Sequence, residues 1–307
     1  MSTRLEPRFG VSLPSLSDMP QIYVHIGLPK TATTTLQTQV FMNHPDWVYL
    51  GTMLPRILNV DPAFKLLEGY VQKGEGRAED VRNALRGRIE LEGKPLFVSE
   101  ENFSIGAFPG LGPDHRMAQT RRQKQVRLAE VFDGLDVVVL VGLRSFRDVV
   151  YSAYVEYQDW YLGSGMTCEE LVSASDSLGM YRYADLRNEL ESLWPNRVHA
   201  LDFDQVIQGR IEFPGFAWQQ PSKPLPNMRQ HPKSHQGVVR ETNVRRPLKP
   251  LVELLAPSMP QLAHWLWGLK IAKRVVVPRW TDDVCETLSP LEQASEAARK
   301  AWLSESR

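Results

Sequence analysis

Residues 22–40 read IYVHIGLPKTATTTLQTQV, and they contain the change from strand to helix from which the fold can be predicted. The run over residues 22–26 is apolar enough for a buried strand. Gly27 interrupts it, and a turn through Pro29 and Lys30 leads into three consecutive threonines and a helical apolar pattern. Such a turn directs backbone N–H groups and the positive end of a helix dipole at one point. The sequence therefore predicts an anion site here.

Further apolar runs predict strands that lie beside the first one. These runs cover residues 95–99, 136–143 and 198–203. Helical periodicity is present near residues 34–42, 77–91, 116–133, 146–162, 181–193, 248–273 and 288–303. This alternation favours an α/β fold in which helices flank a parallel sheet, with a helical C-terminal extension. We expect an N-terminal arm (1–20), one α/β domain (21–245) and the extension (246–307) packed on that domain.

Composition and charge exclude several classes of protein. The 36 basic and 36 acidic residues give a net charge of zero, which argues against wholesale binding to nucleic acid. Two cysteines, Cys168 and Cys285, are too few for a disulfide framework and indicate a reducing compartment. Residues 1–20 lack the apolar run of a signal peptide, and no stretch has the length of a membrane-spanning helix. We expect a cytoplasmic protein with no nucleic-acid partner.

A second candidate anion ligand follows the strand predicted over residues 136–143. Arg144 stands at its carboxyl end, Ser145 and Asp148 form a candidate capping box, and Ser152 lies two turns into the next helix. The carboxyl ends of parallel strands border the ligand crevice, where a guanidinium beside a hydroxyl suits a phosphate. Taken alone, such an arginine is more often a surface ion-pair former. The threonine-rich turn is likewise open to a second interpretation, a capped helix with an exposed lysine.

The turn at Lys30 differs from the nucleotide-triphosphatase loop, G-x-x-x-x-G-K-[ST]. Lys30 follows Gly27 by three positions, and no second glycine precedes it. This spacing disfavours a P-loop nucleotide kinase, which we keep as one alternative function. A non-catalytic nucleotide-binding protein is the other alternative.

Together the two motifs resemble those of the sulfotransferases that use 3′-phosphoadenosine 5′-phosphosulfate (PAPS). LPKTATTTLQ (28–37) resembles the family's loop for the 5′-phosphosulfate, and LRSFRDVVYSAY (143–154) resembles its 3′-phosphate motif. The resemblance covers about residues 20–245, and within the family the sequence is similar to the bacterial, carbohydrate-type branch. It implies a P-loop-like parallel sheet, PAPS as co-substrate, 3′,5′-adenosine bisphosphate as product, and no metal.

The resemblance also implies roles for single residues. The residues that would bind the 5′-phosphosulfate are Lys30, Thr31, Ala32, Thr33, Thr34 and Thr35. The residues that would bind the 3′-phosphate are Arg144 and Ser152. Lys30 would in addition stabilise the charge that develops on the leaving phosphate oxygen. The sequence departs from the family pattern at Ala32, where the pattern has glycine, and at Phe146, where proline is frequent.

The candidates for a general base come from FVSEENFS, residues 97–104. In the family, a glutamate after serine at this point removes the proton of the acceptor hydroxyl, and Glu101 aligns with it best. Neighbouring strand side chains point to opposite faces, so only one of Glu100 and Glu101 can face the donor. A charge-balancing or helix-capping carboxylate is an equal alternative. His25 is a further candidate base, although a buried, hydrogen-bonded histidine is the simpler interpretation.

The sequence leaves the acceptor open among a glycan, a lipid and a small alcohol. A basic run, Arg121-Arg122-Lys124, either lines an acceptor cleft or forms a solvated helix face. Residues 261–280 mix tryptophans with lysines and arginines, which suits a peripheral membrane contact, a dimer contact or core packing.

Overall fold

The computed structural model describes most of the predicted α/β domain and the C-terminal helix. The described residues are 22–42, 44–53, 61–105, 119–150, 152, 181–219, 239–243, 270–274 and 282–306, with isolated positions between 251 and 266. The predicted arm over residues 1–20, most of the helix predicted over 146–162 and most of 261–280 lie outside them.

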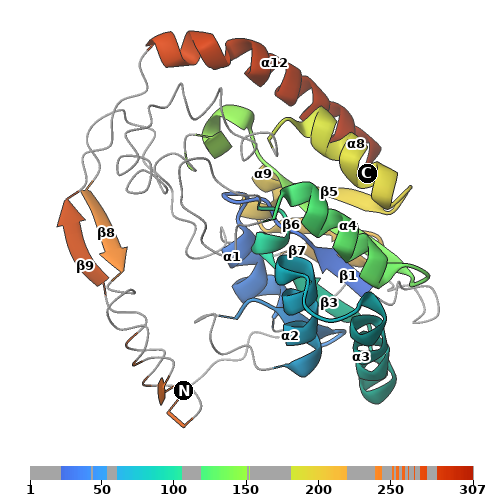
Figure 1. The fold of residues 1–307 in the computed structure, drawn as a ribbon. Helices are drawn as coiled ribbons and strands as arrows, with labels where there is room; N and C mark the ends of the chain where they lie inside the picture. Colours follow the sequence, from blue (N-terminus) through green and yellow to red (C-terminus); the bar gives the residue numbers. More distant parts are fainter. Residues whose placement is uncertain are drawn as a thin grey trace.

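A five-stranded parallel sheet forms the centre of the molecule (Figure 1). Its strands are β1 (Ile22–His25), β2 (Val48–Gly51), β3 (Leu96–Ser99), β4 (Val137–Leu143) and β5 (Val198–Asp202), in the order β2-β3-β1-β4-β5. β1 is central, and Ile22 is in register with Leu96 on one side and Val137 on the other. The chain continues to opposite sides of β1, which is the arrangement that opens a ligand crevice at the strands' carboxyl ends.

Helices flank this sheet, as predicted. They are α1 (Thr33–Thr35) with the π-helical turn η2 (Leu36–Phe41), α2 (Pro62–Glu68) with η4 (Gly69–Lys73), α3 (Ala78–Glu92), η5 (Glu101–Phe103), α4 (Arg121–Phe132), α8 (Tyr183–Leu193), α9 (Phe203–Ile207) and α12 (Asp282–Glu305). Residues 146–150 and 152 are also helical. Among the described residues, no helix combines the length and the apolar character needed to cross a membrane.

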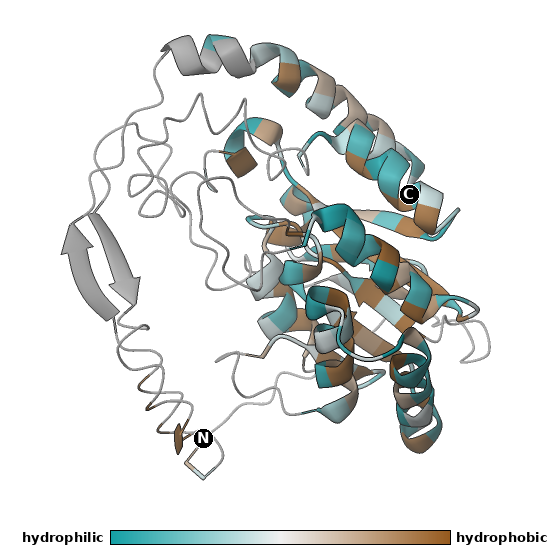
Figure 2. Ribbon diagram, in the orientation of Figure 1, coloured by the Kyte–Doolittle hydropathy of each residue, from teal (hydrophilic) through white to brown (hydrophobic). Residues whose placement is uncertain are grey.

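The two faces of the sheet pack into two separate apolar clusters because alternate strand residues face opposite ways. Ile22 and Val24 belong to the cluster that α2, α3, α4 and α8 cover. Tyr23 belongs to the other cluster, which is rich in aromatic rings from η2 and from the hairpin of β6 (Arg210–Phe213) and β7 (Phe216–Gln219). Figure 2 shows the brown of hydrophobic residues on the central strands. Both faces are therefore buried, as a parallel sheet requires.

The C-terminal helix α12 packs on the α/β core. Figure 1 shows it running beside α8, and Trp302 from its last turns is buried in the cluster that includes Ile22. Polar contacts add to this packing, since the Ser295 hydroxyl donates to the Tyr181 carbonyl at 2.6 Å and a Glu296 carboxylate oxygen accepts from the Phe146 N–H at 2.6 Å. The extension is thus joined to the segment that follows β4.

The sequence analysis missed some strands and misassigned one. β2 was not predicted because its apolar run is only four residues long and its pairing with β3 is a tertiary contact. The helix predicted over 248–273 is wrong at its end, where β9 (Lys270–Arg274) pairs antiparallel with β8 (Val239–Asn243). A local helical pattern was overridden there by pairing with a distant segment.

We expect Trp302→Ala to lower the free energy of unfolding by about 3–5 kcal/mol, because the substitution leaves a cavity in the main core. Chemical denaturation followed by circular dichroism measures this change. The control is Leu91→Ala in α3, whose side chain is 74% exposed and whose loss should change stability by about 0.5 kcal/mol or less. If α12 were an independent unit, Trp302→Ala would leave the main unfolding transition at its wild-type position.

Candidate functional site

Four consecutive carbonyl oxygens between β1 and α1 each accept a hydrogen bond from a side chain. The pairs are Gly27 with the Ser104 hydroxyl, Leu28 with the Thr31 hydroxyl at 2.7 Å, Pro29 with the Tyr181 hydroxyl at 3.1 Å, and Lys30 with the Arg144 guanidinium at 3.1 Å. Three of these donors lie just outside regular elements: Ser104 follows η5, Tyr181 precedes α8, and Arg144 follows β4. The turn is therefore held from several sides by the folded core.

These bonds determine where the N–H groups of the turn point. In a planar trans peptide the N–H is directed opposite to the carbonyl, so the Lys30 N–H points away from Tyr181 and the Leu28 N–H away from Ser104. The backbone φ is 70° at Lys30 and 65° at Ala32 and is negative at Thr31 between them. Alternation of this kind is typical of the concave nests of N–H groups that bind anions, and within this turn the Thr31 N–H donates to the Leu28 carbonyl at 3.3 Å. The first N–H groups of α1 (Thr33–Thr35) follow this turn directly and have no partner within the helix.

Ala32 stands where the resemblance predicts a glycine. It adopts the left-handed conformation that glycine would take, with φ 65° and ψ 19°. A left-handed conformation costs a non-glycine residue about 1–2 kcal/mol, and Lys30 bears the same cost. The hydrogen bonds to the turn's carbonyl oxygens offset this strain. Backbone strain of this kind is concentrated at functional sites.

The threonines of the turn have different roles. The hydroxyls of Thr31 and Thr33 both donate to the Leu28 carbonyl, at 2.7 and 3.1 Å, and both side chains are buried. Their hydroxyl protons are therefore already used in shaping the turn. Thr35 is buried as well, whereas Thr34 is exposed at the start of α1. Of the four predicted hydroxyl donors, the one of Thr34 is open to solvent.

Two glycines make room for these threonine side chains. A Cβ atom at Gly142 of β4 would lie 2.7 Å from the Thr31 hydroxyl oxygen, and one at Gly27 would lie 2.8 Å from the Thr33 hydroxyl oxygen. Gly27 also has a φ of 43°, which side chains disfavour. The turn consequently folds closely over the carboxyl end of β4.

Arg144 joins the two predicted motifs. Its Nη1 donates to the Lys30 carbonyl, and its guanidinium lies 4.4 Å from the ring centre of Phe203. Burial lowers the pKa of Arg144, and the nearby carboxylate of Asp148 opposes this shift. The Tyr183 hydroxyl donates to the Arg144 carbonyl at 2.6 Å, which fixes the backbone that carries the guanidinium. The cationic side chain thus stands directly beside the strained turn.

Ser145 and Ser152 extend this second motif. The Asp148 N–H donates to the Ser145 hydroxyl at 3.4 Å, which is the backbone contact of the predicted capping box. Ser152 is helical, as predicted, and its side chain is buried. Phe146, at the family's proline position, is buried in the main core.

The two glutamates after β3 differ in their surroundings. Glu100 is 3% exposed, and its carboxylate oxygens accept hydrogen bonds from the Asn102 N–H at 2.9 Å and from the Thr52 hydroxyl. Glu100 therefore caps η5, which is the helix-capping alternative left open by the sequence. Glu101 is partly exposed in η5. The Ser104 hydroxyl lies within hydrogen-bond distance of both the Glu101 and the Gly27 carbonyl oxygens, so Glu101 stands next to the turn.

His25 is a fully buried residue of β1. Its Nδ1 lies 2.8 Å from the Ser99 hydroxyl oxygen, to which the Gln37 amide also donates at 3.1 Å. Burial lowers the pKa of His25 to about 3, so the imidazole is neutral near pH 7. This geometry supports the interpretation of His25 as a buried, hydrogen-bonded residue over its interpretation as a second base.

The basic run of α4 has a packing role. Arg121 pairs with Glu189, and Arg122 donates to the Ser192 hydroxyl at 3.4 Å, so both contact α8. Lys124 is buried. The prediction of a solvated face is therefore wrong for Lys124.

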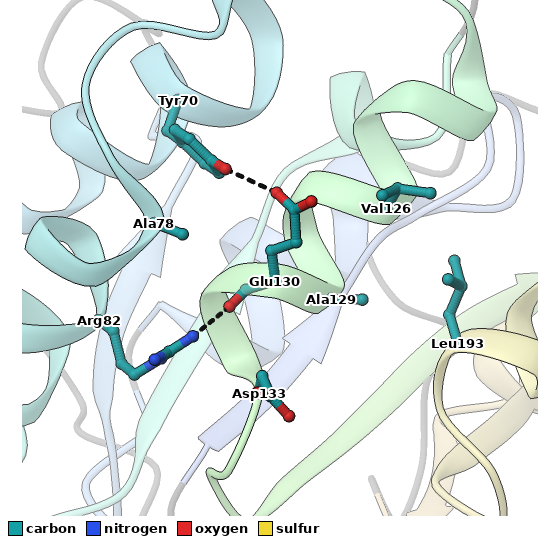
Figure 3. Close-up of a pocket in the computed structure, with 8 residues that line it drawn as sticks. All are labelled: Tyr70, Ala78, Arg82, Val126, Ala129, Glu130, Asp133 and Leu193. Carbon is teal, nitrogen blue, oxygen red and sulfur yellow. Dashed lines mark hydrogen bonds between the residues drawn. The ribbon is translucent and has the colours of Figure 1, made fainter.

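A shallow hollow of about 540 Å³ lies away from the candidate residues (Figure 3). Its lining is contributed by η4, α3, α4 and α8: Tyr70, Ala78, Arg82, Val126, Ala129, Glu130, Asp133 and Leu193. Across it, the Tyr70 hydroxyl donates to the Glu130 carboxylate at 2.6 Å. None of these residues belongs to either predicted motif.

Sequence reasoning missed Ser104, Tyr181 and Phe203. Each of them contacts the turn or Arg144 from a distant part of the chain, and such a contact leaves no signal in the local sequence. In the part of the chain that the structure describes, no group of three or more His, Cys, Asp or Glu side chains could hold a metal ion. No protein-family model matches the chain, and no curated protein matches it either.

Acid should destabilise the fold through His25. The unfolded imidazole has a pKa near 6.5 and the folded one about 3, so the unfolded state binds more protons around and below pH 6.5, and stability decreases as the pH is lowered. From pH 7 to pH 5 this loss amounts to about 2 kcal/mol of unfolding free energy. Urea denaturation at the two pH values measures it.

The control for this prediction is His25→Asn, which keeps a polar atom near Ser99 and does not titrate. Its loss of stability between pH 7 and pH 5 should be smaller than that of the wild type by about 2 kcal/mol. Equal losses in the two proteins would show that His25 takes up no extra proton on unfolding.

Proposed function

We propose that the protein is a PAPS-dependent sulfotransferase that moves a sulfuryl group to a hydroxyl or amine of an acceptor, with a glycan or a lipid-linked glycan as the preferred acceptor class. One observation carries this proposal: the carbonyl oxygens of residues 27–30 accept hydrogen bonds from side chains, so that the Leu28 and Lys30 N–H groups point away from those donors, and the Arg144 guanidinium contacts the same turn. Such a site accommodates two anionic groups at once, and PAPS carries a 5′-phosphosulfate and a 3′-phosphate. The resemblance of both motifs to the family supports the same assignment.

The proposed reaction is an in-line displacement at sulfur. Glu101 accepts the proton of the acceptor hydroxyl, whose oxygen forms a bond to the sulfur while the bond from sulfur to the 5′-phosphate oxygen breaks. The product nucleotide, 3′,5′-adenosine bisphosphate, leaves with the electron pair of that bond. Lys30 and the N–H groups of the turn stabilise the charge that develops on the leaving oxygen. Arg144 and Ser152 hold the 3′-phosphate and thereby orient the donor.

The binding of product nucleotide tests the donor site. We expect 3′,5′-adenosine bisphosphate to bind more tightly than AMP, and Arg144→Gln to weaken the bisphosphate by about ten- to a hundredfold with AMP nearly unchanged. Loss of a charge-assisted hydrogen bond costs about 1.5–3 kcal/mol, and glutamine keeps a neutral donor for the Lys30 carbonyl. Isothermal titration calorimetry measures both affinities.

Arg147→Ala is the matched control, because Arg147 lies three residues later, is largely exposed and pairs with Glu292. Its affinity for the bisphosphate should equal that of the wild type. ATP with Mg²⁺ is titrated in parallel, and a preference for it over the bisphosphate would favour the nucleotide kinase. Tight bisphosphate binding without turnover of labelled PAPS across an acceptor library would favour the non-catalytic nucleotide-binding protein.

Paired glutamine variants test the base. Glu101→Gln should lower turnover by about two to four powers of ten without weakening bisphosphate binding, since it removes a positioned base and keeps its shape. Glu100→Gln should instead lower the melting temperature, because Glu100 caps η5 and accepts from Thr52, and should change turnover much less. Turnover is measured at saturating PAPS below the melting temperature of each variant. Near-normal turnover of Glu101→Gln would rule out Glu101 as the base.

A further inference from the structure

Lys124 is a buried lysine for which the proposed reaction has no direct use. It lies in the first turn of α4, and its side chain is 1% exposed. The ammonium donates to the carbonyl oxygens of Asn102 at 3.1 Å and of Ile105 at 2.7 Å. These two carbonyls lie at either end of the short segment that follows Glu101.

The neighbouring side chain contacts the same segment. The Gln125 amide donates to the Phe103 carbonyl at 2.8 Å, and Gln125 is also buried. Consecutive residues of α4 thus hold the carbonyls of Asn102, Phe103 and Ile105. In the same segment, the Ser104 hydroxyl donates to the Gly27 carbonyl. Residues 102–105 are therefore fixed between α4 and the turn over residues 27–32, which we call the anion-binding turn because of its proposed role.

The charge of Lys124 is costly to bury. Burial lowers the pKa of Lys124 to about 8, and the carboxylate of Glu100 opposes this shift only in part. An apolar side chain of similar length would fill the same space without this desolvation cost. What the ammonium adds is directional hydrogen bonding to two carbonyls at once.

We propose that Lys124 is a positioning residue, which clamps residues 102–105 and thereby holds Glu101 beside the anion-binding turn. It touches neither donor nor acceptor and acts through Glu101. The catalytic part of this inference rests on the proposed function, whereas the clamp itself is a property of the fold.

The first test measures the clamp without any substrate. In Lys124→Met, the amides of Phe103 and Ser104 should exchange hydrogen at least tenfold faster than in the wild type, because their bonds to the Glu100 and Glu101 carbonyls lose support. Lys94→Met is the matched control, since Lys94 also donates to a carbonyl, that of Pro45 at 2.8 Å, but is exposed at the other end of β3. It should leave these two exchange rates unchanged.

The second test asks whether Lys124 acts through Glu101. Lys124→Met should lower kcat at least tenfold and leave the affinity for 3′,5′-adenosine bisphosphate within about twofold of wild type. In the Glu101→Gln background the same substitution should lower kcat by less than twofold, because the group that it positions is already gone. A merely structural lysine would lower kcat by the same factor in both backgrounds.

The two tests separate the failure of this inference from that of the proposed function. Unchanged exchange at Phe103 and Ser104 in Lys124→Met overturns the clamp, whatever reaction the protein performs. Absence of wild-type PAPS turnover overturns the proposed function and, with it, the catalytic role of Lys124, while hydrogen exchange still decides the clamp. If Lys124→Met does not fold, Lys124→Gln is measured in the same way, because it keeps a shorter donor and removes the charge.

Discussion

The hydrogen bonds to the carbonyl oxygens of residues 27–30 are the constraint on which the candidate site depends. They hold Lys30 and Ala32 in a backbone conformation that neither residue prefers. Because carbonyl and N–H point in opposite directions, the same bonds determine which groups of the turn are left to meet an anion. The proposed affinity of this turn for anions thus depends on the hydrogen bonds that its carbonyl oxygens accept.

The donors of these bonds link the site to the whole α/β core. Tyr181 contacts the Pro29 carbonyl and is itself held by Ser295 of α12. Arg144 extends from the end of β4, and Ser104 follows η5. A change in the packing of α12 or η5 therefore reaches the turn through one or two hydrogen bonds, which connects the stability of these elements with the geometry of the site.

Hydrogen bonding within the fold also gives different roles to neighbouring side chains of the same type. Glu100 and Glu101 are adjacent, yet the carboxylate of Glu100 is engaged in capping η5 and in the contact with Thr52. Thr31 and Thr33 use their hydroxyl protons inside the turn, whereas Thr34 is exposed. A polar group that satisfies a buried partner stabilises the structure, so residues of the same type that stand next to each other can have different roles.

The sequence by itself determined the parallel sheet, the strand-turn-helix at Lys30 and the adjacency of Lys30 and Arg144, because these follow from local periodicity and from the rule that strand ends meet at one edge. It did not predict β2 or the pairing of β8 with β9, which depend on distant partners. Nor did it distinguish the capping Glu100 from the partly exposed Glu101, or predict the contacts of Ser104 and Tyr181 with the turn and the burial of Lys124. Only the tertiary structure decided these points, because a side chain's role depends on which hydrogen-bond partners folding brings to it from remote segments.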